Sequence, residues 1–290
     1  MRRKQLYIRQ QGRDIQQGEQ LIAAGVRLSP DHLLLLAENG SQQVKVYRRP
    51  RVAVICTGSE LVKSGEQLLP GQKISSNGIL LASLLQVENC RVVQSLTVGD
   101  DAEMMMSRMQ QVLGKNTPDL LISTGGMGPG KYDLMEQIVA RLGGRVIYNR
   151  LKIRPGKATL FAMIGNTPFF ALPGPPPAVR LLYHELVAPG LQRLQGALKE
   201  DTALGGLVDG VLAEAVDIRR TDHLALKGAV AGVRDGRLYV RAAGKLEPIN
   251  AIMHLPCKGD GKTKRGQREK NQRVKVRLVA PLAAENGSNE

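Results

Sequence analysis

The sequence contains no tryptophan, and aromatic residues make up only 3% of its 290 residues. Few stacking surfaces of the kind used by single-strand nucleic-acid-binding proteins are therefore available, which argues against a nucleic-acid partner. The three cysteines show no CxxC spacing, and the four histidines form no HExxH or His-x-His cluster. Neither a disulfide framework nor a soft-metal site is indicated.

Long hydrophobic runs are missing as well. Apolar stretches such as residues 33–37 are far shorter than the roughly 20 residues that span a bilayer, so no membrane partner is expected. The basic amino terminus, residues 1–10, has no apolar run behind it and does not have the pattern of a secretory signal. These absences predict a cytoplasmic location.

The charge balance is strongly basic, because 41 Lys and Arg residues stand against 26 Asp and Glu residues and give a formal net charge of +15. This balance favours anionic partners such as phosphates. Hydrophobic residues make up 42% and charged residues 23% of the chain, which is typical of a globular protein. At roughly 100–200 residues per domain, the length predicts about two domains.

From residue 51 to residue 194, short apolar runs alternate with longer amphipathic runs. This alternation predicts an α/β domain of three layers, with helices on both faces of a mostly parallel sheet. Strands are expected over residues 51–56, 90–98, 119–123, 145–151, 159–163 and 168–172, and helices over 77–85, 101–109, 133–142 and 177–194. Ligands of such sheets bind beyond the carboxyl ends of the strands.

Two of these helices carry residues that need an interpretation. Asn77 is expected to cap the first helix. In the second, Met104, Met105 and Met109 suggest either a soft-metal or promiscuous binding surface or ordinary helical packing, and packing is the preferred interpretation.

The segments on either side of the α/β domain have a different texture. Residues 1–49 are interpreted as a partial N-terminal segment, residues 50–198 as the α/β domain, and residues 199–290 as a small all-β domain. The strands of this last domain are expected over residues 211–218, 223–230, 237–241 and 274–279, where short apolar runs are divided by glycine-containing turns.

The strongest local motif is a glycine-rich loop between a predicted strand and a predicted helix. It comprises Thr124, Gly125, Gly126 and Gly128, and Lys131 follows it. Glycines allow backbone N–H groups to converge on an anion, and a helix amino terminus adds its dipole. The spacing matches neither the dinucleotide fingerprint nor the P-loop. A phosphate-binding loop is the preferred interpretation, and a tight turn without a ligand is the alternative.

Two further rigid loops follow predicted strands. One contains Arg154 and Lys157 on either side of Pro155 and Gly156. Its two cations are suited to holding a phosphate or an oxyanion, although two solvated charges beside a turn would look the same. The other loop contains Pro173 and Gly174 and carries no charge.

Acidic residues stand just after three predicted strands. Glu60, Asp100 and Asp133 occupy positions from which carboxylates hold Mg²⁺ against ligand phosphates. Each of them alone is more often a helix cap.

Taken together, these loops resemble those of a known family. The runs CTGSEL at 56–61, TGG at 124–126 with YD at 132–133, RPGK at 154–157 and LPG at 172–174 occur in the order and approximate spacing of the molybdopterin molybdenumtransferases, the MoeA and gephyrin E-domain family. Residues 8–19 resemble part of that family's elongated first domain, and the β-rich tail resembles its last domain. The family's second domain is expected to be absent from this chain.

The resemblance implies a role in molybdenum cofactor biosynthesis, namely insertion of molybdate into adenylylated molybdopterin with release of AMP. It implies that Glu60 and Asp133 are catalytic and that Asp133, Glu60 and Asp14 hold Mg²⁺. It also implies a homodimer and other molybdenum-cofactor proteins as partners. The implied substrate-binding residues are Thr57, Gly58, Ser59, Asp100, Thr124, Gly125, Gly126, Gly128, Lys131, Arg154, Pro155, Gly156, Lys157, Pro173 and Gly174.

The chain departs from the family pattern at the acidic positions. Ser59 and Lys131 stand where the family has carboxylates, so a weakened metal site is expected. Three hypotheses follow: a molybdenumtransferase-like enzyme, a protein that binds the pterin or its nucleotide without catalysis, and a polyanion binder. The last depends on the basic run 258–273, for which a solvated hairpin tip is the preferred interpretation.

Overall fold

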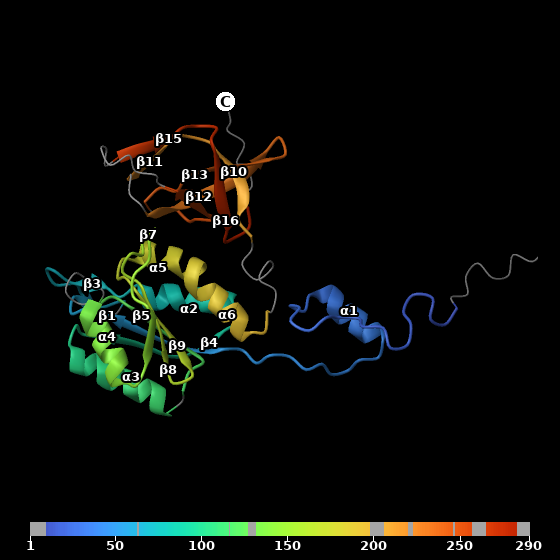
Figure 1. Cartoon of the computed structure of the whole chain (residues 1–290), viewed down its shortest axis with the longest axis horizontal. Coiled ribbons are helices and arrows are strands. Elements are labelled where there is room, and N and C mark those ends of the chain that lie inside the picture. Colours follow the sequence, from blue (N-terminus) through green and yellow to red (C-terminus); the bar gives the residue numbers. More distant parts are fainter. Residues whose placement is uncertain are drawn as a thin grey trace, which may run out of the picture.

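The computed structural model describes residues 10–62, 64–115, 117–126, 132–197, 206–219, 223–245, 247–256 and 265–282. An α/β domain and a C-terminal β-barrel lie one above the other, and an N-terminal arm extends to the side (Figure 1). The arm contains one helix, α1 (Pro30–Glu38), which Ser29 and His32 cap reciprocally. Within the described ranges, every helix is too short or too polar to cross a bilayer.

The α/β domain is built on a six-stranded sheet in the order β4-β1-β5-β9-β8-β6. The first four strands are parallel, whereas β8 pairs antiparallel with both β9 and β6, so the mostly parallel sheet that the sequence predicted is confirmed. The strands are β1 (Arg51–Thr57), β4 (Arg91–Val98), β5 (Leu120–Thr124), β6 (Arg145–Tyr148), β8 (Leu160–Ile164) and β9 (Thr167–Leu172). Two short strands, β2 (Leu61–Val62) and β3 (Lys73–Ile74), pair beside it.

Helices cover both faces of this sheet, as predicted. One face carries α3 (Ala102–Lys115) and α4 (Tyr132–Arg141), and the other carries α2 (Asn77–Val87) and the helical segment after β9. Asp101 caps α3, because its carboxylate accepts a hydrogen bond from the Met104 amide at 2.7 Å. Met105 and Met109 are buried in the core under α3, which confirms the packing interpretation, whereas Met104 is exposed.

The helix predicted over residues 177–194 is interrupted. It consists of α5 (Pro176–Leu182), a π-helical turn η1 (Tyr183–Val187) and α6 (Ala188–Leu194). The turn is invisible in the sequence, because the apolar pattern continues through it and Tyr183 and Val187 are both buried.

The C-terminal domain is a barrel, in which the order β13-β10-β16-β14-β12-β7 is closed by pairing of β13 with β12. Its strands are β10 (Val208–Leu212), β12 (Leu224–Arg234), β13 (Arg237–Ala242), β14 (Ala251–Pro256) and β16 (Arg273–Leu278), and a separate pair is formed by β11 (Val216–Arg219) and β15 (Arg265–Arg268). The all-β prediction is confirmed. The single strand predicted over 211–218 is wrong, since it falls on β10 and β11. The sequence also missed β14 and β15.

One barrel strand comes from the α/β domain. The predicted strand 145–151 ends at Tyr148, and β7 (Ile153–Arg154) follows it and pairs in parallel with β12. The predicted boundary at residue 198 falls in 198–205, outside the described residues, and stays a prediction. Residues 258–264 of the basic run 258–273 also lie outside the described residues, whereas residues 265–268 of that run form β15.

Candidate functional site

Three loops meet at the carboxyl edge of the parallel strands. Thr57 ends β1, Thr124 ends β5, and the Pro173–Gly174 loop follows β9. The Thr57 hydroxyl donates a hydrogen bond to the Thr124 carbonyl oxygen at 3.2 Å, and the Gly125 amide donates to the Leu172 carbonyl oxygen at 3.0 Å. The structure therefore joins loops that lie more than a hundred residues apart in the sequence.

Glycine is required where the β5 loop passes β1. Gly125 has φ +89°, and a Cβ atom on it would lie 2.2 Å from the Thr57 carbonyl oxygen. At Gly126, with φ +65°, a Cβ atom would lie 3.1 Å from the Thr57 hydroxyl oxygen. Two successive residues in this conformation leave the loop backbone uncovered by side chains at the sheet edge. Gly128 and Lys131 lie outside the described residues.

Asn77 links two of these loops, a role that the sequence did not predict. Its Nδ2 atom donates to the Thr124 hydroxyl oxygen at 3.2 Å and to the Gly174 carbonyl oxygen at 2.8 Å. The predicted capping role is wrong, because Ser76 occupies the cap position and Asn77 lies inside the helix. The Asn77 side chain is buried because it points at the strand ends rather than at its own helix.

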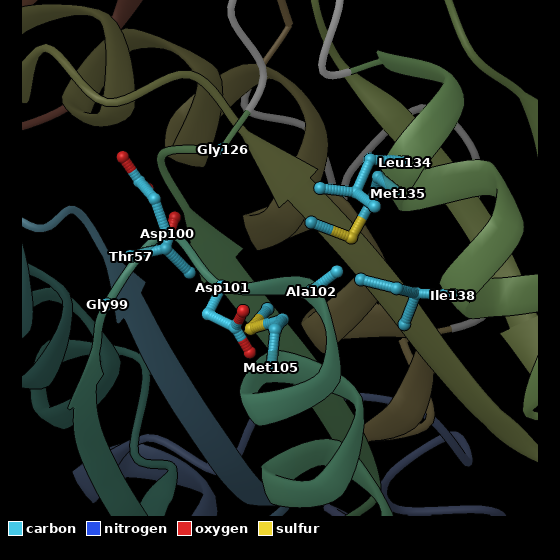
Figure 2. A pocket seen from close by; sticks show the side chains of 10 residues that line it. All are labelled: Thr57, Gly99, Asp100, Asp101, Ala102, Met105, Gly126, Leu134, Met135 and Ile138. Atoms are coloured by element: carbon cyan, nitrogen blue, oxygen red, sulfur yellow. The ribbon is translucent and has the colours of Figure 1, made fainter.

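A narrow crevice opens beside the glycine loop, between the beginnings of α3 and α4 (Figure 2). Thr57, Asp100 and Gly126 line its polar side, so three predicted binding residues come together here. Its apolar side is lined by Ala102, Met105, Leu134, Met135 and Ile138. The Asp100 amide donates to the Ser59 hydroxyl oxygen at 3.2 Å, which places Ser59 next to the crevice.

The predicted metal ligands are not brought together among the described side chains. Asp14 lies on the N-terminal arm, and Glu60 lies 4.0 Å from the ammonium group of Lys73. The Asp133 backbone begins α4, but its side chain lies outside the description. No group of three possible metal ligands occurs within the part of the chain that is described. The magnesium site therefore stays a prediction.

A second cavity, of about 160 Å³, lies where β7 meets the barrel. This volume exceeds the roughly 30 Å³ that one water molecule occupies in the liquid, so the cavity has room for a small polyatomic ion. Arg154 and Lys227 line it together with Asp217, over an apolar floor of Ile218, Ala225, Leu226 and Leu255.

Of the two cations predicted to act together, only Arg154 is among the described residues that line this cavity. Arg154 lies on β7, paired with Ala225, and lines the cavity. Lys157 is exposed, and it is not among the described residues that line the cavity. Gly156 explains the tight turn between them, because a Cβ atom there would lie 2.5 Å from Leu182. The sequence missed Lys227, since only the pairing of β7 with β12 brings it to Arg154.

Cys56 lies one residue before Thr57, at the end of β1, and is fully buried. Burial raises the pKa of its thiol, although hydrogen bonds with Thr124 and Ser75 act in the opposite direction. The thiol therefore stays protonated near neutral pH, and it supports the loop rather than acting as a nucleophile.

The family described as "Probable molybdopterin binding domain" matches residues 53–193, which include all three loops. Over 225 residues the chain is 32% identical to the molybdopterin molybdenumtransferase of Nostoc sp., and the match covers 77% of this chain. The chain belongs to the molybdopterin molybdenumtransferase family. A relative with the same name from Haemophilus influenzae is 33% identical over 190 residues, which is 65% of this chain and 46% of the relative.

A solved structure of the family confirms the fold. The molybdopterin biosynthesis protein moea from Pyrococcus horikosii superposes with a TM-score of 0.73 at 25% identity, covering 92% of this chain and 64% of that one. The chain spans about half the length of the curated relatives it matches, including 49% of the Nostoc protein.

Proposed function

We propose that the protein acts in molybdenum cofactor biosynthesis by binding adenylylated molybdopterin at the glycine loop and molybdate in the cavity between β7 and the barrel. The observation that carries this proposal is the pair of sites: an uncovered glycine backbone at the strand ends, and a separate cavity lined by two cations and one carboxylate. Backbone N–H groups suit the phosphates of a pterin nucleotide. Arg154 and Lys227 suit a compact oxyanion.

The proposed reaction is insertion of molybdate with release of AMP, as the names of the family's relatives suggest. In this scheme Gly126 holds the phosphates, while Gly125, whose amide is bonded to Leu172, lets the loop pass close to β1. Thr57 and Asp100 orient the nucleotide beside the crevice, and Arg154 and Lys227 neutralise the oxyanion. Glu60 and Asp133 remain the proposed catalytic acids. Tungstate has the same shape and charge as molybdate, so both ions need to be measured.

A carrier that binds the pterin nucleotide without converting it is the second candidate. Two changes at the positions expected to hold metal favour this carrier. Glu60 lies beside the ammonium group of Lys73, and Ser59, which accepts a hydrogen bond, stands where the family has a carboxylate. The two candidates are separated by incubating the protein with adenylylated molybdopterin and molybdate and measuring AMP. Tight binding without AMP release supports the carrier, and AMP release supports the enzyme. Failure to bind the pterin nucleotide contradicts both.

A homodimer is proposed because apolar side chains of the N-terminal arm are exposed. Leu33, Leu34 and Val46 are 56%, 58% and 68% exposed, and a second copy of the chain would cover such an arm. Light scattering after size-exclusion chromatography tests this proposal, since Leu33→Glu with Leu34→Glu should yield a monomer. Other molybdenum-cofactor proteins remain proposed partners, and the cytoplasm remains the proposed location.

A further inference from the structure

Glu185 joins the two domains through one buried oxygen atom. Its Oε1 atom accepts hydrogen bonds from His254 Nε2 at 2.9 Å and from Arg277 Nε at 3.0 Å. The side chains of Glu185, His254 and Arg277 are only 9%, 11% and 12% exposed. Glu185 belongs to η1 of the α/β domain, whereas His254 and Arg277 lie on β14 and β16 of the barrel.

The carboxylate is ionised in this setting. Burial by itself raises the pKa of Glu185, but the hydrogen bonds from His254 and Arg277 and their charges outweigh it and lower the pKa overall. Removing one member of a buried ionic group leaves the others without compensation, so the contact is costly to break.

Leu181 and Glu185 both face the barrel from the helical segment after β9. Leu181, one helical turn before Glu185, packs with Leu226 and Ile252 of the barrel in a small apolar cluster. Residues four apart lie on the same face of a helix, so Leu181 and Glu185 together form one contact surface for the barrel.

The same contact helps to hold the barrel, which carries Lys227, against the α/β domain, which carries the glycine loop. Arg154 faces the same cavity from β7, which pairs with β12 and whose Ile153 also packs on the α/β core. Gly125 and Gly126 belong to the α/β sheet. Rotation of the barrel on its contact with η1 would therefore move the Lys227 side of the cavity relative to the glycine loop.

We propose that Glu185 is a positioning residue that couples the two sites by holding the barrel in one orientation. This inference rests on the proposed function, because the coupling it describes is between pterin-nucleotide and molybdate binding. It predicts that loss of the contact weakens cooperation between the ligands more than it weakens the binding of either one alone.

Calorimetry on the full chain tests this coupling. The affinity for adenylylated molybdopterin is measured with and without molybdate, in the unmodified protein and in Glu185→Gln and Glu185→Ala. The Gln variant keeps the side-chain volume and one acceptor oxygen, which guards against misfolding. Molybdate should tighten nucleotide binding at least fivefold in the unmodified protein and less than twofold in Glu185→Ala, while each ligand alone binds within threefold of normal.

Glu247→Gln is the matched control. Glu247 pairs with Arg241 through two hydrogen bonds, but both residues belong to the barrel, so this variant loses an ionic contact without releasing the domains. It should keep the full coupling. Equal coupling in the unmodified protein and both Glu185 variants would overturn the inference, as would an equal loss of coupling in Glu247→Gln.

Hydrogen exchange without any ligand separates this inference from the proposed function. Amides of β14 and η1 should exchange at least tenfold faster in Glu185→Ala, whereas those of β5 should not change. Unchanged exchange in β14 and η1 would overturn the positioning role even if both ligands bind. If the unmodified protein binds neither ligand, the proposed function and the coupling both fail, whatever the exchange shows about the contact.

Discussion

The Nδ2 atom of Asn77 lies 2.8 Å from the carbonyl oxygen of Gly174, 97 residues further along the chain. The same nitrogen reaches the Thr124 hydroxyl oxygen, so one buried amide group holds two strand-end loops together. Because the glycine loop begins directly after Thr124, this amide determines where the proposed phosphate-binding backbone lies.

Replacing Asn77 by Ala should therefore destabilise the protein and weaken pterin-nucleotide binding together. The change leaves the Gly174 carbonyl oxygen and the Thr124 hydroxyl without this donor, at a cost of about 1–3 kcal/mol in the free energy of unfolding. Urea denaturation and calorimetry measure the two effects. Asn77→Asp should be no better, since a carboxylate cannot donate to a carbonyl oxygen. Full nucleotide affinity in both variants would contradict the role of this amide.

Gly125→Ala should lower nucleotide affinity, because its Cβ atom would lie 2.2 Å from the Thr57 carbonyl oxygen and the loop would have to move. Gly143→Ala is the control, since Gly143 has φ +69° but no atom within 4 Å of an added Cβ. Both variants carry the strain of a left-handed residue, on the order of 1 kcal/mol. Only Gly125→Ala should also lower the affinity for the nucleotide. Similar affinities in the two variants would remove the loop from the site.

Arg154→Gln combined with Lys227→Gln should reduce molybdate affinity by at least tenfold, which corresponds to about 1.4 kcal/mol. Lys157→Gln removes an equally cationic side chain from the exposed part of the same loop and should leave the affinity within twofold. Calorimetry with molybdate and then tungstate gives both values. An equal loss in the Lys157 variant would mean that general surface charge, and not the cavity, attracts the ion.

Nucleotide binding should depend little on Mg²⁺. The described carboxylates do not form a metal site, and Lys131 supplies a positive charge near the glycine loop in place of a carboxylate. We expect the affinity in EDTA to stay within threefold of that in Mg²⁺, and Lys131→Asp to increase the dependence. Rapid Mg²⁺-dependent AMP release by the unmodified protein would refute this prediction.

Acid should destabilise the protein through His184. Burial lowers the pKa of His184, Glu185 opposes this, and Arg180 and Arg277 add to it, so that the pKa falls to about 4. The unfolded chain binds a proton near pH 6.5, so between pH 6.5 and 4 the unfolded state is favoured, by up to a few kcal/mol. Urea denaturation should show a smaller loss of stability from pH 7 to 4.5 in His184→Gln than in the unmodified protein. Equal losses would count against this role.

The elements with a clear local pattern were predictable from the sequence. The β1 strand is a short β-branched run stopped by Thr57 and Gly58, and Asp101 marks the beginning of α3. The β14 strand was missed because its first five residues are all buried, so no alternation marks it. The π-helical turn was missed because its apolar spacing is that of a continuous helix.

The sequence predicted which loops form the site, but it did not predict the contacts that join them. Thr57, Asp100 and Gly126 each follow a strand, so the rule for parallel sheets brought them to one edge. Asn77 and Lys227 carry no local sign of their roles. Their partners are Gly174 and Arg154, which only the tertiary fold brings near. The separation of Arg154 from Lys157 also depends on which domain β7 joins.

The β7 strand also limits how this protein can be divided. By chain order it belongs to the α/β domain, yet by hydrogen bonding it is the outermost strand of the barrel. A fragment containing only the barrel would expose the backbone of β12 at Leu224 and Ala225, an open edge that invites pairing with other chains. We expect such a fragment to aggregate, and a barrel carrying its own copy of β7 to stay soluble. The barrel therefore cannot be moved to another protein as one continuous piece of chain. A recombination event at the boundary before β10 would separate the barrel from β7.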